Sequence, residues 1–274
     1  MKIKEVRQRQ LSVSQDDLKS KISLLPPVPS FKEALIRKQG SEPLSVIAEV
    51  KARSPGRENV SSLDPTAIAR DYVAGGAKAI SVLTDQSWFG GSLETLKEVH
   101  ETVDIPLLHK EFIVSEYQLL EGCVRGASAA LILAYYFNEE ELRQMVMECK
   151  SIGLEPVVEC SLEHELPLAL SVNPDVLMIN NRPIAALPED PGSSYLQGSV
   201  TVTLDWWQRN QALRKWKEQP GHLLISASCI KTWEDIQVLM GIPCDACLIG
   251  NSAMTAIDRV AFLQSLTGIQ HGIC

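Results

Sequence analysis

The sequence predicts a (β/α)₈ barrel that is preceded by an N-terminal helical extension. Strand-like and helix-like segments alternate along the chain, and the strand-like segments are apolar throughout. From residue 46 onward there are eight such runs: VIAEV (46–50), AISVL (79–83), PLLHKEF (106–112), AALILA (129–134), EPVVEC (155–160), VLMIN (176–180), HLLISAS (222–228) and ACLIG (246–250). Continuous apolar runs are typical of parallel strands that are covered on both faces. Eight strand–helix units in about 225 residues also suit this fold, whose usual size is about 250 residues.

The segments between these runs have the periodicity of amphipathic helices. In PTAIARDYVAGGA (65–77) and NEEELRQMVMECKSIG (138–153), apolar residues recur at three- and four-residue spacing, and a glycine follows the pattern. The competing fold is an open doubly wound sheet, which usually carries GxGxxG after its first strand. The first strand here is followed by KARSPGREN (51–59), which lacks that pattern. We therefore favour the barrel.

Residues 1–45 form the predicted extension, and residues 46–274 form the predicted catalytic barrel domain. Helical patterns in the extension lie around 15–23 and 30–38, and LLPPVP (24–29) separates them. Proline cannot continue a helix, so we expect two helices that pack on the barrel.

Two segments late in the chain carry further predictions. Residues 183–199, PIAALPEDPGSSYLQGS, are rich in Pro, Gly and Ser, which predicts a mobile loop. The following segment, TLDWWQRNQALRKWKEQ (203–219), is expected to form one helix with Asp205 near its start.

Composition and charge exclude several classes of function. The chain has 274 residues, a formal net charge of -8 and no long block of Lys or Arg, so a nucleic-acid or anionic-membrane surface is not expected. The N-terminus is too polar for a secretory signal, and no apolar run is long enough to span a bilayer. Seven scattered cysteines fit reduced, buried thiols. We expect a cytoplasmic protein.

Cys244 and Cys247 make the one CxxC of the sequence. A zinc site needs about four ligands, and neither a second CxxC nor a paired His motif supplies the others. We therefore expect no metal, and we interpret Cys247 as a core residue at the start of a strand.

Polar residues gather where the predicted strands end. In this fold the catalytic groups come from the C-terminal ends of the strands and from the loops that follow. Any one polar residue there could be a solvated strand end, but agreement among most of the strands favours a site. The residues in these positions are Glu49, Lys51, Lys110, Glu159, Asn180, Arg182, Ser226, Ser228, Gly250 and Ser252.

The last two units suggest a phosphate site. Loops after strands 7 and 8 of such barrels often bind phosphate through backbone N–H groups, and SCIKTWED (228–235) and GNSAM (250–254) lie there. Gly250 lets the backbone approach an anion. Lys51 and Lys110 would meet the anionic substrate and supply a proton. We expect burial and mutual repulsion to lower the pKa of these lysines, which would make them acids near neutral pH.

These residues resemble the indole-3-glycerol phosphate synthase family, the ring-closing enzymes of tryptophan biosynthesis. The resemblance runs from about residue 46 to 265. The motifs that carry it are IAEVKARSP (47–55), DP..IA..Y...GA.AISVLTD (64–85), FGGSLETL (89–96), PLLHKEF (106–112), VVE (157–159) and INNR (179–182). It implies a TIM barrel with an N-terminal helical extension, no metal and no organic cofactor. The family substrate is carboxyphenylaminodeoxyribulose phosphate, and the products are indole-3-glycerol phosphate, CO₂ and water.

The resemblance also implies roles for the catalytic residues. Lys110 matches the general acid that protonates the ketone oxygen as the aromatic carbon attacks. Glu159 matches the carboxylate that assists the later dehydration. Lys51 matches the lysine that grips the anionic groups of the substrate and helps to transfer protons. Glu49 matches the residue that holds the amine region of the substrate and the lysine network.

The substrate-binding residues are implied in the same way. Asn180 and Arg182 match residues that orient the anthranilate ring and its carboxylate. The implied phosphate ligands are Ser54, Gly250 and Ser252, and the implied apolar wall for the aromatic ring is formed by Phe89, Phe112 and Leu131. Ser228, in the loop after the seventh strand, is a further candidate for substrate binding. The implied partner is a small phosphorylated aromatic substrate, without nucleic acid or membrane. The chain itself is expected to be a monomer or a weak homo-oligomer.

The sequence departs from the family mainly after the seventh strand. The family usually has Ser-Glu-Ser-Gly-Ile there, whereas this chain has SASCI (226–230). Ala227 replaces a glutamate that faces the substrate. Cys229 replaces a glycine, so its side chain could crowd the anion or require a backbone angle that cysteine disfavours.

Other departures lie elsewhere on the barrel. Glu111 replaces the usual aspartate after Lys110, Pro183 and Ile184 replace Asp-Leu after NNR, and SPGREN (54–59) replaces a Ser-Pro-Ser-Lys-Gly type. Three interpretations remain open: drift with the activity kept, a paralogue acting on a related aromatic amino-sugar phosphate in specialised metabolism, or a noncatalytic ligand-binding barrel. The retained acid–base residues argue against the third, because a protein that only binds has little use for them.

Overall fold

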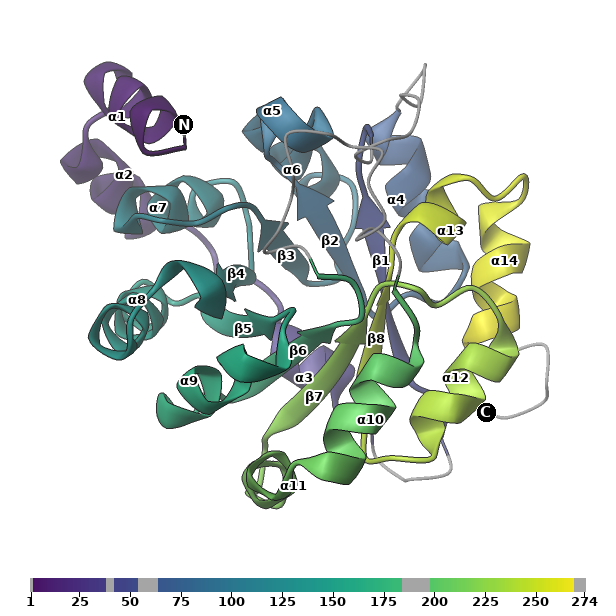
Figure 1. Cartoon of the computed structure of the whole chain (residues 1–274). Coiled ribbons are helices and arrows are strands. Elements are labelled where there is room, and N and C mark those ends of the chain that lie inside the picture. The colour runs from purple at the N-terminus through teal and green to yellow at the C-terminus, as the bar shows by residue number, and fades with distance from the viewer. Residues whose placement is uncertain (1, 38–41, 54–63, 184–197, 269–274) are drawn as a thin grey trace.

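Eight parallel strands close into a barrel at the centre of the molecule (Figure 1). The computed structural model describes residues 2–37, 42–53, 64–183 and 198–268. Each strand pairs with the next along the chain, and β8 pairs back with β1, as in Ala48 opposite Ile249. The strands are β1 (Ser45–Val50), β2 (Ala79–Leu83), β3 (Leu107–Lys110), β4 (Ala129–Leu133), β5 (Glu155–Cys160), β6 (Val176–Asn180), β7 (Leu223–Ala227) and β8 (Ala246–Ile249). The predicted fold class is confirmed.

Helices surround the barrel between the strands (Figure 1). They are α4 (Pro65–Ala74), α5 (Gln86–Phe89), α6 (Leu93–His100), α7 (Glu116–Cys123), α8 (Glu139–Ser151), α9 (Leu166–Ser171), α10 (Thr201–Arg209), α11 (Gln211–Lys217), α12 (Trp233–Met240), α13 (Asn251–Met254) and α14 (Arg259–Leu266), with short 3₁₀ turns η1 (Ala134–Tyr136) and η2 (Glu163–Glu165). Polar side chains fix where many of them begin. Asn138 and Glu141 form a reciprocal capping box at the start of α8, an arrangement that satisfies N–H groups without a partner in the helix.

One apolar cluster fills the barrel interior, and buried charged side chains follow it at the C-terminal end of the barrel. Side chains two residues apart on a strand share a face. Ile47, Leu108 and Val157 pack in the interior cluster. Two residues further along the same strands stand Glu49, Lys110 and Glu159, so these buried charged groups continue the inward-facing rows at the C-terminal end.

The opposite end of the barrel is closed by α3 (Phe31–Leu35). Phe31 and Leu35 are fully buried members of the interior cluster. Glu155, at the start of β5, fastens this helix by accepting hydrogen bonds from the Ser30 hydroxyl at 2.7 Å and the Lys32 backbone N–H at 2.6 Å. The interior of the barrel is therefore closed at the N-terminal ends of the described strands.

Helices precede the first strand, as predicted, but the extension differs in detail. The predicted patterns correspond to α2 (Gln15–Ile22) and to α3, which ends at Leu35. An additional helix, α1 (Lys2–Ser12), was not predicted, because Val6 is its one buried residue and it shows no apolar stripe. It lies beside α7 (Figure 1), where Arg9 forms an ion pair with Glu121.

The single helix predicted over 203–219 is wrong. Two helices, α10 and α11, meet at Asn210, whose backbone is extended (φ -106°, ψ 104°) and whose side chain accepts a hydrogen bond from the Leu213 N–H. Asparagine favours such an N-cap. Asp205 lies in the middle of α10, which begins at Thr201. Most of the loop predicted to be mobile, residues 184–197, lies outside the described residues.

The described cysteines are free thiols. Cys247 packs in the core between strands and helices, as interpreted from the sequence, and burial raises the pKa of its thiol. In the described ranges, no helix is both long enough and apolar enough to cross a bilayer.

Candidate active site

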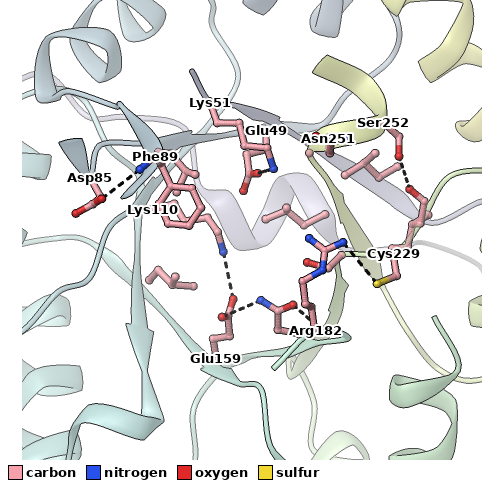
Figure 2. A pocket seen from close by; sticks show the side chains of 18 of the residues that line it. Glu49, Lys51, Asp85, Phe89, Lys110, Glu159, Arg182, Cys229, Asn251 and Ser252 are labelled. Carbon is pink, nitrogen blue, oxygen red and sulfur yellow. Dashed lines mark hydrogen bonds and ion pairs between the residues drawn. The ribbon is translucent and has the colours of Figure 1, made fainter. Parts of the chain in front are cut away.

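A cavity of about 260 Å³ opens at the C-terminal ends of the strands (Figure 2). It brings together the described residues that were predicted to be catalytic or substrate-binding, with Ser226 as the one strand-end candidate left out. Those residues are Glu49, Lys51, Phe89, Lys110, Phe112, Leu131, Glu159, Asn180, Arg182, Ser228, Gly250 and Ser252. Ser54 lies outside the described residues. These residues line one cavity, and the catalytic or binding role of each one stays a prediction.

Lys110, Glu159 and Asn180 form a buried hydrogen-bonded chain across the ends of β3, β5 and β6 (Figure 2). The Lys110 ammonium donates to Glu159 Oε2 at 3.2 Å, and the Asn180 amide donates to Glu159 Oε1 at 3.1 Å. Asn180 Oδ1 in turn accepts the backbone N–H of Arg182 at 3.1 Å. Both carboxylate oxygens of Glu159 are thereby held, which fixes the orientation of the group.

The pKa of Lys110 is raised, so the predicted lowering is wrong for this residue. Burial alone would lower the pKa of the ammonium, but the carboxylates of Glu159 and Glu49 outweigh that penalty. Repulsion between the two lysines does not dominate, because each has its own carboxylate. Lys110 is consequently a charged ammonium at neutral pH and holds the proton that a general acid must donate.

Glu49 and Lys51 form the second ion pair, at the end of β1 (Figure 2). Lys51 Nζ lies 2.7 Å from Glu49 Oε1. Burial would raise the pKa of Glu49, but Lys51 and Lys110 outweigh it, so the pKa is lowered. Gly250 makes room for the pair: a Cβ at that position would collide with Glu49 Oε1 and lie 2.7 Å from Lys51 Nζ. A side chain at position 250 would therefore force the charged ends of Glu49 and Lys51 to shift, so the glycine matters for this pair as well as for the predicted anion approach.

The predicted phosphate end lies where the β7–α12 loop faces α13. Ser228 and Cys229 both have left-handed backbones, with φ of 71° and 65°. This is the backbone angle that cysteine disfavours, and it bears out the concern raised by the replacement of glycine. The Cys229 thiol lies 4.0 Å from Arg182 Nη2, and Ser252 donates to the Ile230 carbonyl at 3.2 Å.

Two neighbouring residues of β7 do not take part in the site. Ser226, a candidate from its position, is fully buried and bonds to the Asn181 amide at 2.9 Å and the Thr203 hydroxyl at 2.8 Å. It anchors α10 instead. Ala227 is buried in the interior cluster with Leu248, so the position of the missing glutamate is occupied by a methyl group that faces the interior.

An aromatic wall lines the other side of the cavity. The rings of Phe89 and Phe112 lie 6.0 Å apart, and Tyr136 meets Phe112 edge-on at 6.2 Å. Other residues that line the cavity were not predicted as site residues: Leu83, Asp85, Leu133, Ile230, Lys231, Leu248, Ile249 and Asn251, together with Glu111 and Cys229, which the sequence marked only as departures from the family. Two-residue periodicity would have found Leu133 from Leu131, and Leu248 from Gly250. Asp85 and Glu111 carry no such signal.

The described part of the chain contains no group of three or more His, Cys, Asp or Glu placed to hold a metal ion. Arg182 Nε, by contrast, is buried without a hydrogen-bond partner among those residues. A buried guanidinium nitrogen of this kind is suited to an anion.

Comparisons with known proteins agree on one family. The family model described as indole-3-glycerol phosphate synthase matches residues 1–266. A protein of that name from Streptomyces griseus is 34% identical over 264 residues, which cover 96% of this chain and 90% of the relative. One from Roseiflexus sp. (strain RS-1) is 32% identical over 271 residues, with 96% and 94% covered, and one from Aquifex aeolicus is 34% identical over 223 residues, with 81% of each covered.

A solved structure matches in fold. A crystal structure of 3-hexulose-6-phosphate synthase from Salmonella typhimurium superimposes with a TM-score of 0.60 at 13% sequence identity, covering 83% of this chain and 100% of the other. At that identity the likeness concerns the barrel alone.

Proposed function

The chain belongs to the indole-3-glycerol phosphate synthase family, and on that premise we propose that the cavity at the barrel mouth is where its reaction takes place. The protein is an indole-3-glycerol-phosphate synthase, a carboxy-lyase of tryptophan biosynthesis that closes the ring of carboxyphenylaminodeoxyribulose phosphate with loss of CO₂ and water.

One observation carries the proposal: two ammonium–carboxylate pairs, contributed by three strands, converge on the cavity. Lys110 pairs with Glu159 at 3.2 Å, and Lys51 pairs with Glu49 at 2.7 Å. Asn180 also donates a hydrogen bond to Glu159 at 3.1 Å, so this carboxylate is in place before substrate arrives. Such preorganisation lowers the barrier for steps that develop charge.

In the first step, the ring carbon that bears the carboxylate bonds to the ketone carbon. Lys110 donates its proton to the ketone oxygen, which becomes a hydroxyl group. The bond from the ring carbon to the carboxylate then breaks, CO₂ leaves, and the electron pair restores the aromatic ring. In the last step Lys51 donates a proton to the hydroxyl, which departs as water, while a carboxylate takes the proton released from the neighbouring carbon as the new ring double bond forms. Glu159 is suited to that transfer because it touches Lys110 and can pass the proton back.

The remaining residues would bind the anionic and aromatic parts of the substrate. Arg182, whose Nε has no partner among the described residues, is available for the anthranilate carboxylate. Asn180 holds the catalytic carboxylate beside it. We assign Lys51 to the substrate's anionic groups, Ser228, Gly250 and Ser252 to the phosphate, and Phe89, Phe112 and Leu131 to the ring. We assign Ser54 to the phosphate from the sequence alone.

A second candidate function is ring chemistry on a related aromatic amino-sugar phosphate. Two departures from the family favour this second function. Ala227 leaves the interior without the carboxylate of the family's glutamate, and Cys229 places a side chain at the phosphate end of the cavity. The purified chain would then bind such a compound but fail to support a tryptophan-requiring strain that lacks its own synthase. A noncatalytic barrel is disfavoured by the two ion pairs described above.

The test is a fluorescence assay for the indole product with the purified chain and carboxyphenylaminodeoxyribulose phosphate. Turnover that depends on Lys110 supports the proposal; turnover that survives the loss of Lys110 contradicts the assigned mechanism. We further propose that the enzyme works in the cytoplasm, as a monomer or weak homo-oligomer, without nucleic acid or membrane.

A further inference from the structure

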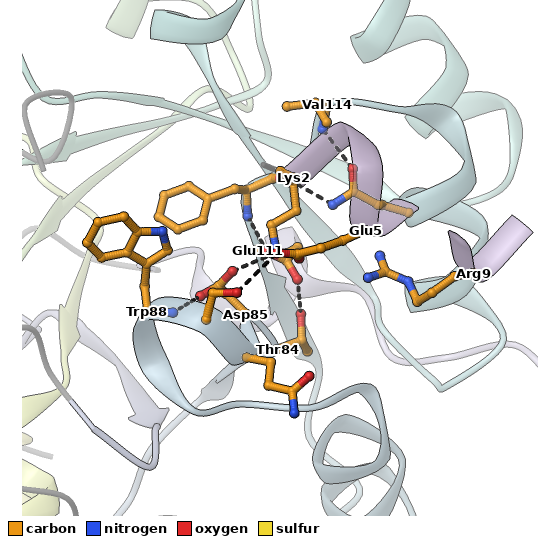
Figure 3. A network of polar contacts seen from close by, with 12 residues as sticks. Lys2, Glu5, Arg9, Thr84, Asp85, Trp88, Glu111 and Val114 are labelled. Carbon is orange, nitrogen blue, oxygen red and sulfur yellow. Dashed lines mark hydrogen bonds and ion pairs between the residues drawn. The ribbon is translucent and has the colours of Figure 1, made fainter. Parts of the chain in front are cut away.

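Two buried carboxylates, Asp85 and Glu111, line the cavity and have no part in the proposed chemistry. Figure 3 shows them side by side. Their side chains are 1% and 5% exposed. Burial raises the pKa of Glu111, and the nearby charge of Asp85 adds to the effect. Two neighbouring carboxylates that are shielded from water need a cation between them if both are to remain ionised.

Each carboxylate accepts a hydrogen bond from the backbone N–H of a residue whose ring belongs to the aromatic wall. Asp85 caps α5: its Oδ1 accepts the N–H groups of Trp88 at 2.6 Å and Phe89 at 3.4 Å. Glu111 Oε1 accepts the N–H of Phe112 at 2.8 Å. The wall formed by Phe89 and Phe112 therefore depends on where these two carboxylates sit.

The cation between them comes from the far N-terminus of the described chain (Figure 3). Lys2 Nζ lies 2.6 Å from Asp85 Oδ2 and 3.2 Å from Glu111 Oε1. Its own helix holds it in place, because Glu5 lies 2.8 Å from the same ammonium and accepts a hydrogen bond from Ser87 of α5 at 3.0 Å. Burial would lower the pKa of Lys2, but Glu111 and Asp85 outweigh it, so the pKa is raised and the ammonium stays charged.

We propose that Lys2 is a positioning residue for the substrate pocket: its ammonium holds Asp85 and Glu111 together, and through them the backbones of Phe89 and Phe112. The inference rests on the proposed use of that wall for the substrate ring. Lys2 is not among the described residues that line the cavity, so it acts through the two carboxylates and not on the substrate. Without it, one carboxylate must take up a proton or move away, and either change displaces a ring.

Two ligands separate this role from a general loss of structure. The first is the reduced alcohol of the substrate, which keeps the aromatic ring and phosphate but has no ketone to react. The second is inorganic phosphate, which probes only the Ser228–Ser252 end. Isothermal titration of the full chain should show that Lys2→Met weakens binding of the alcohol by about tenfold, while phosphate binding is unchanged. In turnover the loss should appear mainly in KM.

Three variants sharpen the test. Lys4→Met removes an exposed lysine of the same helix and should bind both ligands as wild type does. Lys2→Arg keeps the charge and should stay within about threefold of wild type. Lys2→Met/Glu111→Gln removes the repulsion with Asp85 and should recover part of the lost affinity.

The inference is overturned if Lys2→Met binds the alcohol as tightly as wild type, or if it loses the alcohol and phosphate to the same extent. A wild-type chain that binds the alcohol but makes no indole product would overturn the proposed function, while a selective loss in Lys2→Met would still support the positioning role. A wild-type chain that does not bind the alcohol would overturn both.

Discussion

The ammonium of Lys110 lies 3.2 Å from the carboxylate of Glu159, although 49 positions of sequence separate them. Only β4 stands between the strands that carry them, and both residues occupy the last inward-facing positions before the cavity. The barrel therefore assembles an acid and its proton-transfer partner from segments that have no local reason to meet.

Replacing Lys110 with methionine should lower kcat by about 10²–10⁴-fold, the usual contribution of a general acid. The fold should persist by circular dichroism, with a lower Tm because Glu159 loses its buried partner. Lys78→Met is a matched control, since Lys78 is exposed just before β2 at the other end of the barrel. Unchanged kcat in Lys110→Met would remove the assigned mechanism.

The pH profile should reflect the raised pKa of Lys110. A general acid must be protonated to act, so its contribution is full below its pKa and is lost as the pH rises through that value. Because the carboxylates of Glu159 and Glu49 raise this pKa above its ordinary value of 10.5, kcat/KM should show no Lys110-dependent decline between neutral pH and about pH 10. A decline near neutrality that moves to higher pH in Lys110→Arg would speak for a lowered pKa of Lys110 instead.

Cys229→Gly should tighten binding of inorganic phosphate and lower KM. Glycine adopts the φ of 65° found there without the penalty of about 1–2 kcal/mol that a side chain carries in this conformation. Removing this penalty should raise the free energy of unfolding. The greater conformational freedom of glycine in the unfolded chain offsets part of that increase. Cys229→Ala is the control, because it removes the thiol but keeps the strain; an identical effect from both variants would show that the sulfur atom, and not the backbone, is decisive.

Gly250→Ala should lower kcat/KM by about 100-fold, because the added methyl group separates Glu49 from Lys51. The Cβ would lie 2.7 Å from Lys51 Nζ, so the ammonium must move away from its present position. Gly241→Ala is the matched control, since its Cβ would meet only the Val238 carbonyl at 3.2 Å. The measurements are kcat/KM and Tm of both variants, so that a loss of activity can be separated from a loss of stability. Equal kcat/KM in the two variants would mean that the ion pair tolerates displacement.

Much of the site was predictable because strand periodicity is a local property. An apolar run that ends in a charged residue, such as Lys110 or Glu159, gives both the strand and the inward direction of its last side chain. The closed order of the strands then brings those ends together. For the same reason Leu133 could have been found from Leu131.

The rest depended on contacts that no local pattern reports. The sign of the pKa shift at Lys110 is set by carboxylates 49 and 61 positions away, Glu159 and Glu49. Helix α1 has no apolar stripe and is held by ion pairs with residues such as Asp85 and Glu121. Polar helices of this kind are specified by their partners, and the partners are known only once the fold is assembled.

The most direct measurement is the yield of indole product and CO₂ from carboxyphenylaminodeoxyribulose phosphate with the purified wild-type chain. The account predicts that both accumulate in equal amounts and that both vanish in Lys110→Met. Binding of the substrate without either product, or CO₂ release without indole fluorescence, would contradict it.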